Sequence, residues 1–142
     1  MATILCIEDE ADLREVIVEV LEDTGYGVLQ ASDGEEGLEA ILEHKPDLVI
    51  CDITMPKKDG NQLLQELRGE HKKLDDMPFI FLSALSGEQQ VLAGLRHGAD
   101  DYLSKPVSFE LLKTKIATSL RQMDRMKQRK QEERKNLCLL DF

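Results

Sequence analysis

The sequence lacks the features by which several classes of protein are recognised. No apolar run reaches half the length of a membrane-spanning helix, and no basic segment precedes the first apolar residues. The three cysteines are odd in number, and neither they nor the three histidines have the spacing of metal ligands. We therefore expect a cytoplasmic protein with no membrane span and no disulfide framework.

Positive charge is scarce except near the carboxyl end. The chain carries 28 Asp and Glu against 18 Lys and Arg, a formal net charge of −10. Residues 1–112 hold 9 basic and 24 acidic side chains, whereas residues 113–135 hold 9 basic and 3 acidic ones. An acidic body repels nucleic acid, so we expect no direct nucleic-acid binding from this chain. The basic run most often marks a solvated helix face, and contact with a phosphate backbone is the alternative.

What is present is an alternation of short apolar runs with amphipathic helical patterns. The runs predict strands at 3–7, 28–31, 48–52, 79–82 and 101–104, of which the first and third read as buried. Five strands alternating with helices predict an α/β fold with a doubly wound, five-stranded parallel sheet, flavodoxin-like (βα)5 in strand order 2-1-3-4-5. Residues 1–120 would form this domain, and residues 121–142 would extend its last helix.

Local signals mark several helix ends. Gly25 follows the first amphipathic stretch as a C-terminal glycine would, and the second helix must end before Pro46. Asp33, Ser86 and Ser108 precede the second, fourth and last helical stretches, where short polar side chains cap the free N–H groups.

Polar side chains follow four of the five strands at the same edge of the predicted sheet. Glu8 and Asp9 follow the first strand, Asp52 ends the third, and Ser83 and Lys105 follow the fourth and fifth. Strands 1 and 3 flank the switch point at which sheets of this kind bind ligands. Each residue alone has an ordinary explanation as a helix cap, turn residue, surface charge or ion-pair partner. Together they predict one polar crevice.

The crevice would hold a magnesium ion. Three carboxylates brought together repel, and at least one pKa must rise unless a cation is present. Mg²⁺ prefers one or two carboxylates together with water and phosphate oxygens. We expect Asp9 and Asp52 to be direct ligands, the backbone carbonyl of Thr54 to be a third, and Glu8 to act through water.

A carboxylate beside such a cation can attack phosphorus, because phosphoryl transfer depends mainly on positioning and charge neutralisation. Asp52 is the candidate nucleophile and phosphoacceptor. Lys105 would supply a positive charge and Ser83 a hydroxyl to the transferred oxygens, with backbone N–H groups near Thr54 and Ala84 completing the cradle.

These segments resemble the receiver domains of two-component response regulators, the CheY-like family. The resemblance covers roughly residues 3–120, and the five matching pieces occur in the family's order and spacing. They are Glu8-Asp9, Asp52–Gly60, Phe81–Ala84, Gly98–Tyr102 and Leu103–Pro106.

The resemblance implies that Asp52 takes a phosphoryl group from a phosphohistidine on a sensor histidine kinase or phosphotransfer protein, with Mg²⁺ bound. It implies a phosphoacceptor regulator and not an enzyme beyond self-phosphotransfer and autodephosphorylation. It also implies that Ser83 follows the phosphoryl group, that Tyr102 changes rotamer, and that the Lys105-Pro106 bond is cis. The family often has Thr in place of Ser83, and either residue supplies the hydroxyl.

The last helix continues beyond the usual end of such a domain. From Leu112, alternating steps of four and three residues predict a coiled-coil seam, in which six of nine positions are apolar. The positions are Leu112, Ile116, Ser119, Met123, Met126, Lys130, Glu133, Leu137 and Leu140. We expect a homodimer through this helix and a link to an output domain outside the chain; the alternative is a frayed, basic amphipathic end.

Three other functions stay open at this stage. A Mg²⁺-dependent phosphatase with an Asp nucleophile normally has a second Asp two residues later, where this chain has Thr54. A flavodoxin-like binding module would need a phosphate loop where Glu8-Asp9-Glu10 stands. A degenerate receiver would act as an interaction module only, yet all the pocket residues are present.

Overall fold

The structure, a computed structural model, describes residues 2–55, 57–70, 76–83 and 99–140. The strands are β1 (Thr3–Ile7), β2 (Gly27–Ala31), β3 (Leu48–Asp52), β4 (Phe79–Ser83) and β5 (Asp101–Ser104). The helices are α1 (Ala11–Thr24), α2 (Gly34–His44), α3 (Gly60–Glu70) and α5 (Phe109–Leu140). The helix predicted after Ser86 lies outside the described residues.

The five strands form one parallel sheet in the order β2-β1-β3-β4-β5. This confirms the flavodoxin-like topology predicted from the alternating pattern. Strand positions also agree closely, since β2 begins one residue earlier than predicted and β4 includes Ser83. In this order β1 and β3 are neighbours, so the polar residues at their carboxyl ends meet at one edge.

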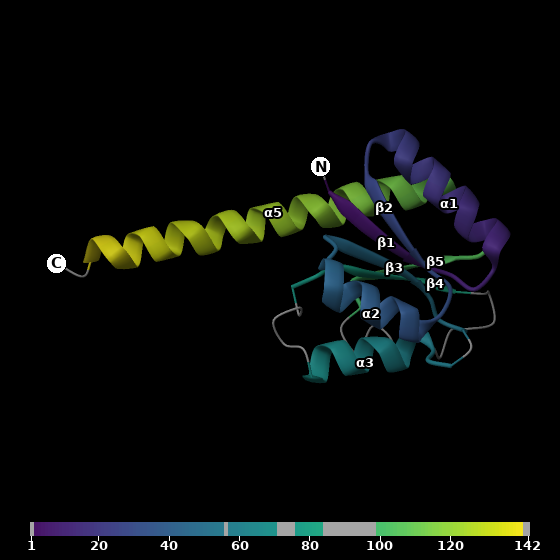
Figure 1. The fold of residues 1–142 in the computed structure, drawn as a ribbon. Coiled ribbons are helices and arrows are strands. Elements are labelled where there is room, and N and C mark those ends of the chain that lie inside the picture. Colours follow the sequence, from purple (N-terminus) through teal and green to yellow (C-terminus); the bar gives the residue numbers. More distant parts are fainter. Residues whose placement is uncertain (1, 56, 71–75, 84–98, 141–142) are drawn as a thin grey trace.

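Helices cover both faces of the sheet, with α1 and α5 on one face and α2 and α3 on the other (Figure 1). Successive strand residues alternate between the two faces, which divides the apolar side chains into two layers. One layer packs under α2 and α3 and includes Leu5, Ile7, Val49, Leu63, Leu64, Phe79 and Phe81. The other packs under α1 and α5 and includes Ile4, Cys6, Ile17, Leu21, Ile50, Ile80 and Leu82.

The predicted helix ends are largely confirmed. Gly25 closes α1 in the left-handed conformation with φ of 106°, which costs little without a Cβ. The Asp33 carboxylate accepts a hydrogen bond from the Glu36 N–H at 2.9 Å and so caps α2. The Glu36 carboxylate in turn accepts from the Ser32 N–H at 3.0 Å, and α2 ends at His44, with Lys45 as its C-cap before the proline.

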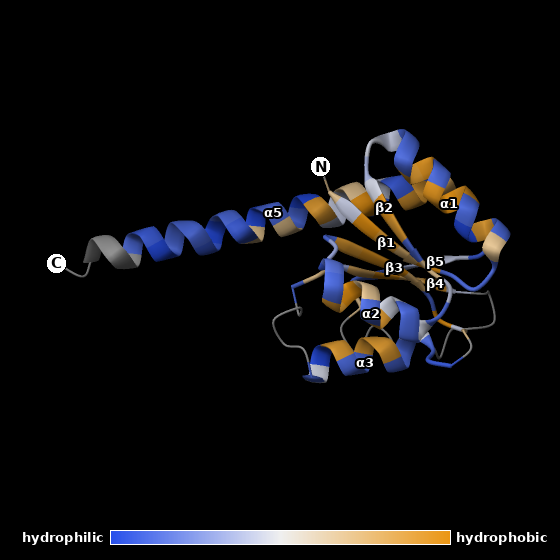
Figure 2. Ribbon diagram, in the orientation of Figure 1, coloured by the Kyte–Doolittle hydropathy of each residue, from blue (hydrophilic) through white to orange (hydrophobic). Residues whose placement is uncertain are grey.

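The last helix, α5, runs without interruption for 32 residues. The Ser108 hydroxyl accepts a hydrogen bond from the Leu111 N–H at 3.3 Å, as its predicted capping role requires. Figure 2 shows that the helix carries apolar residues beside the sheet and becomes hydrophilic over residues 127–136, where it projects. Within the described residues, no helix is both long and apolar enough to cross a membrane.

The seam predicted along α5 is divided by the fold. Leu112, Ile116 and Ser119 are buried against the sheet, so they belong to the domain's own core. Met123 is only partly buried, and residues 127–136 are all exposed. Only the positions after Ser119 can therefore serve the predicted pairing of two copies, because the domain itself covers the first three.

Candidate functional site

The carboxyl edge of the sheet gathers three carboxylates. Glu8 and Asp9 follow β1, and Asp52 ends the neighbouring strand β3. One carboxylate oxygen from each of the three lies within 4.8 Å of the others. Glu8 and Asp52 are buried, whereas Asp9 is exposed. The strand ends thus form the predicted crevice, with two enclosed acids and one that solvent reaches.

A single lysine joins the two enclosed acids. The Lys105 Nζ lies 2.7 Å from Glu8 Oε1 and 3.1 Å from Asp52 Oδ2. Its backbone N–H donates to the Ser83 carbonyl at 2.7 Å, which continues the β4–β5 pairing past the end of β5. The Lys105-Pro106 peptide bond is cis, as the resemblance implied. The sequence therefore predicted that Lys105 reaches the crevice, although it follows β5, which is two strands away from β3 and Asp52.

Crowding changes the protonation of the pocket. Burial raises the pKa of Glu8 to about 8, and the Asp52 and Asp9 carboxyls act in the same direction while Lys105 opposes them. Burial lowers the pKa of Lys105, but the Glu8 and Asp52 carboxylates outweigh burial and leave that pKa raised. The expectation that at least one crowded carboxyl has a raised pKa is met by Glu8.

The remaining predicted residues lie on neighbouring elements. Ser83 is buried at the end of β4, beside the strand that carries Asp52. The Thr54 N–H donates to Asp52 Oδ1 at 3.3 Å, so the loop after β3 holds one oxygen of that carboxylate. Tyr102 lies on β5 with 41% of its surface exposed. Ala84, expected to contribute an N–H group, lies outside the described residues.

The donor set fits a magnesium ion. All three side chains offer carboxylate oxygens, and the exposed Asp9 leaves room for the water that Mg²⁺ retains. Glu8 Oε1 is buried and lies 2.7 Å from Lys105 Nζ, so this carboxylate already has a cationic partner inside the protein. Asp9 and Asp52 would therefore be direct ligands, with Glu8 in an indirect role.

Sequence reasoning missed a contact that positions the loop after β3. A Cβ on Gly34 would overlap the carbonyl oxygen of Lys58, so the first turn of α2 touches the loop backbone directly. Beside this contact, the Lys57 Nζ lies 3.6 Å from the Asp33 carboxylate, and Lys57 has a positive φ of 67°. Asp33 had been predicted only as a helix cap. Nothing local in the sequence indicates that α2 meets this loop.

The same loop is held at its other end by Gly60. Its N–H donates to the Ile53 carbonyl at 2.8 Å, and a Cβ at this position would lie 2.7 Å from the carbonyl oxygen of Asp52. Lys58 also pairs with Glu66 of α3. The loop that carries Thr54 is thus fixed by α2, by α3 and by the end of β3.

A family model described as the response regulator receiver domain matches residues 4–117, a span that includes every pocket residue named above. The chain belongs to this family. Receiver domains bind Mg²⁺ at an acidic pocket, and this chain has a cluster of acidic residues formed by Glu8, Asp9 and Asp52.

Curated relatives of this receiver domain are regulators of transcription. "Probable transcriptional regulator ycf27" of Porphyridium aerugineum is 43% identical over 122 residues, which cover 86% of this chain and 49% of the relative. "DNA-binding dual master transcriptional regulator RpaA" of Synechocystis is 37% identical over 128 residues, which cover 90% and 53%. The chain spans about half the length of the curated relatives that it matches.

Solved structures agree with the fold. A response regulator receiver domain from Clostridium thermocellum has a TM-score of 0.83 at 32% identity, covering 89% of this chain and 99% of that one. A CheY-like receiver domain protein from Methanospirillum hungatei has a TM-score of 0.82 at 28% identity, covering 89% and 98%. The chain is therefore a receiver domain of the two-component type.

Proposed function

We propose that this receiver domain is a Mg²⁺-dependent phosphoacceptor switch in which Asp52 receives a phosphoryl group from a sensor histidine kinase or phosphotransfer protein in the cytoplasm. The observation that carries the proposal is the position of Asp52 between two acids and Lys105, with Lys105 Nζ 3.1 Å from its carboxylate. Lys105 neutralises charge on one side of the carboxylate that would react, and a cation held by the acids would do so on the other.

In the transfer, an Asp52 carboxylate oxygen attacks the phosphorus of the donor's phosphohistidine. The new O–P bond forms as the P–N bond breaks, and the donor imidazole keeps the electron pair. Mg²⁺, when bound, would supply positive charge to the transferring oxygens. Lys105 supplies a positive charge from the protein, while Asp9, Asp52 and the Thr54 carbonyl would hold the metal and Glu8 would act through water.

The switch follows from the added charge. A phosphoryl group brings about −1.5 to −2 charges and three acceptor oxygens into the pocket. The Ser83 hydroxyl would turn toward those oxygens, and Tyr102 would move inward from its half-exposed position on β5. The altered Ser83 and Tyr102 face would then control an output partner or domain. We also propose that residues 121–140 pair two copies of the chain.

The test is direct labelling. The protein is incubated with Mg²⁺ and a small phosphodonor and then weighed by intact-mass spectrometry. Wild type should gain the mass of one phosphoryl group, and the Asp52→Asn variant should gain none. Asp12→Asn is a matched control, because Asp12 is an exposed acid in the first turn of α1, outside the pocket.

Each other result has a distinct meaning. Equal labelling of Asp52→Asn would place the acceptor elsewhere and refute the proposal. An unlabelled wild type would make the chain a degenerate receiver that serves only as an interaction module. Continued release of phosphate from an added phosphomonoester would support the phosphatase alternative, which lacks its usual second Asp because Thr54 stands at that position.

A further inference from the structure

The segment between β1 and α1 carries two of the three acids of the pocket and is tied to the protein through Glu8. The Glu8 N–H donates to the Ala31 carbonyl at 3.0 Å, which continues the β1–β2 pairing past the end of β1. One Glu8 carboxylate oxygen lies 2.7 Å from Lys105 Nζ, and the other accepts from the Glu10 N–H at 3.3 Å. The Glu8 backbone carbonyl accepts from Arg14 Nη1 at 2.7 Å. Glu8 is thus held at its N–H, its carbonyl and both carboxylate oxygens.

Arg14, the donor to that carbonyl, stands in the first turn of α1, where the helix dipole disfavours a cation. Acids such as Asp12 suit this turn, because the amino end of a helix carries partial positive charge. Helical side chains point toward the amino end, so Arg14 reaches back over the end of β1. Its Nε donates to Gln30 Oε1 of β2 at 3.3 Å. A residue placed against the local preference, with two partners outside its own helix, indicates a role that the helix does not require.

The entry to α1 also lacks its usual support. Glu10 occupies the N-cap position in an extended conformation, and among the described residues its side chain makes no capping hydrogen bond. A short polar side chain normally fixes the chain at this point. Here the Arg14 guanidinium fixes it instead, by holding the carbonyl two residues before the cap.

We infer that Arg14 is a positioning residue for the magnesium site, because it fixes the peptide group between Glu8 and Asp9 and so holds the Asp9 carboxylate toward Asp52. The inference rests on the Mg²⁺ site of the proposed function and adds the residue that supports it from α1. Asp9 is exposed, yet its carboxylate lies within 4.8 Å of the other two acids. Ligands held in place before binding bind a metal more tightly, and residues behind them contribute to that affinity.

The charge of Arg14 acts in the opposite direction to its positioning role. A guanidinium near the pocket repels a divalent cation. Burial and Glu8 raise the pKa of Cys6 to about 12 while Arg14 opposes them, in keeping with a positive charge close to β1. Loss of the charge alone would therefore tighten Mg²⁺ binding, whereas loss of positioning would weaken it. The two roles of Arg14 predict effects of opposite sign.

Titration calorimetry with Mg²⁺ on the metal-free full chain separates the two roles. Arg14→Met keeps a long unbranched side chain without its donors, and its dissociation constant for Mg²⁺ should rise about tenfold. Arg14→Lys keeps the charge but lacks the planar fork that spans both acceptors, so its affinity should fall between those of Arg14→Met and wild type.

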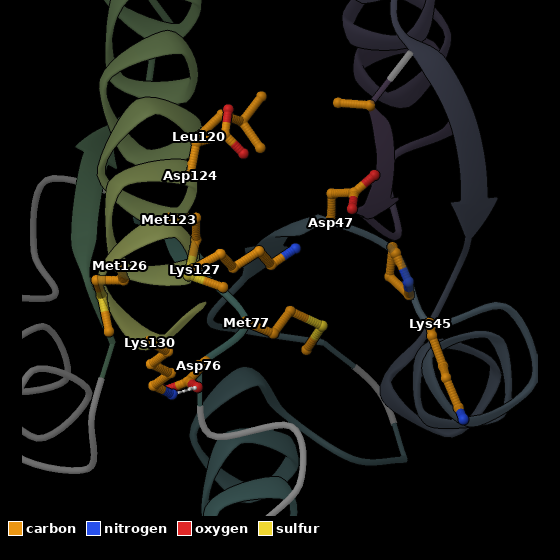
Figure 3. Close-up of a pocket in the computed structure, with 12 residues that line it drawn as sticks. Lys45, Asp47, Asp76, Met77, Leu120, Met123, Asp124, Met126, Lys127 and Lys130 are labelled. Atoms are coloured by element: carbon orange, nitrogen blue, oxygen red, sulfur yellow. Dashed lines mark hydrogen bonds and ion pairs between the residues drawn. The ribbon is translucent and has the colours of Figure 1, made fainter. Parts of the chain in front are cut away.

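Lys127→Met is the matched control, because it also replaces a cation with methionine. Figure 3 shows Lys127 extending from α5 across a groove toward Asp47, which precedes β3 at the amino edge of the sheet. This edge lies opposite the pocket. The control should therefore bind Mg²⁺ as wild type does.

Gln30→Val tests the same contact without removing a charge. Gln30 is exposed on β2, so its loss should spare the fold while the guanidinium loses one of its two partners. The dissociation constant for Mg²⁺ should rise, by a smaller factor than in Arg14→Met, and this variant decides the question if Arg14→Met does not fold. In the metal-free protein, the amides of residues 8–13 should exchange hydrogen faster in both variants than in wild type.

The outcomes separate this inference from the proposed function. Mg²⁺ binding by Arg14→Met that equals or exceeds that of wild type would overturn the positioning role, while labelling of Asp52 in wild type would still support the phosphoacceptor. An equal loss of affinity in Lys127→Met would also overturn it, because the effect would then follow net charge. A wild-type chain that binds no Mg²⁺ would overturn the inference and the metal dependence of the proposed function together.

Discussion

The receiver body, residues 2–120, and the extension, residues 121–140, share one continuous helix but differ in what holds them. In the body, α5 buries Leu112 and Ile116 against the sheet, whereas the extension carries exposed residues from 127 to 136. The same steps of four and three residues run through both parts. The comparison shows that a helical seam becomes core or interface according to whether a sheet already covers it.

The largest expected effect is on the free energy of unfolding, which a substitution in the body should lower far more than one in the extension. Leu112→Ala should lower the free energy of unfolding by about 2–5 kcal/mol, because it leaves a cavity under α5. Met126→Ala should change the free energy of the monomer by less than about 0.5 kcal/mol, because its side chain is 43% exposed. Urea unfolding followed by circular dichroism, at a concentration where the chain is monomeric, measures both.

If Leu112→Ala does not fold, Ile116→Val gives a milder test with an expected cost of about 0.5–1.5 kcal/mol. A cost for Met126→Ala that matches the core substitution would mean that the extension packs on the body more closely than its exposure indicates.

The second prediction concerns the buried Glu8 carboxyl of the receiver body. The pKa of Glu8 rises from 4.5 to about 8 on folding, so the metal-free folded state holds this proton more tightly than the unfolded chain. The tighter proton binding stabilises the folded state fully below pH 4.5, and this stabilisation is lost as the pH rises to about 8. Wild type should therefore lose roughly 2–4 kcal/mol relative to Glu8→Gln across that window.

Addition of Mg²⁺ should reduce this loss in wild type, since a cation favours the charged carboxylate. Chemical denaturation at several pH values, with and without the metal, measures the difference. A constant difference between wild type and Glu8→Gln would contradict the raised pKa.

The third prediction concerns the contact between α2 and the loop after β3. Gly34→Ala should force the Lys58 carbonyl away and displace the loop that carries Thr54. Mg²⁺ affinity should fall about tenfold, as for other residues that support metal ligands from behind. Gly69→Ala is the control, because Gly69 is also helical and a Cβ there meets nothing within 4 Å. Isothermal titration with Mg²⁺ measures the change, and equal affinities for the two variants would remove the proposed positioning role.

The smallest expected effect concerns the ion pair that links the extension to the body. Lys130 and Asp76 form a 2.6 Å ion pair between two half-exposed side chains. Such pairs contribute about 0–1 kcal/mol, so Lys130→Met should alter the unfolding free energy by less than about 0.5 kcal/mol in the monomer. Thermal unfolding at low and high salt measures it. A larger, salt-dependent loss would show that the extension is held to the body by charge.

Much of the candidate site could be predicted from the sequence, because the site residues stand at the ends of strands. Asp52, Ser83 and Lys105 each stand at the carboxyl end of an apolar run, and parallel strands bring those ends to one edge. The alternation with helices predicts a doubly wound parallel sheet, and the strand order was predicted as the commonest one for five strands. The depth of Glu8 and the exposure of Asp9 did not follow, because adjacent acids in the sequence look alike.

By itself, the sequence determined the five strands, their topology and the set of residues at the acidic edge, since these depend on periodicity and chain order. Only the tertiary structure decided which acid is enclosed, that Gly34 meets the loop after β3, and that the α5 seam passes from core to surface after Ser119. The reason is physical: a local pattern records what a side chain prefers, whereas burial, pKa and contact depend on which distant segment arrives beside it.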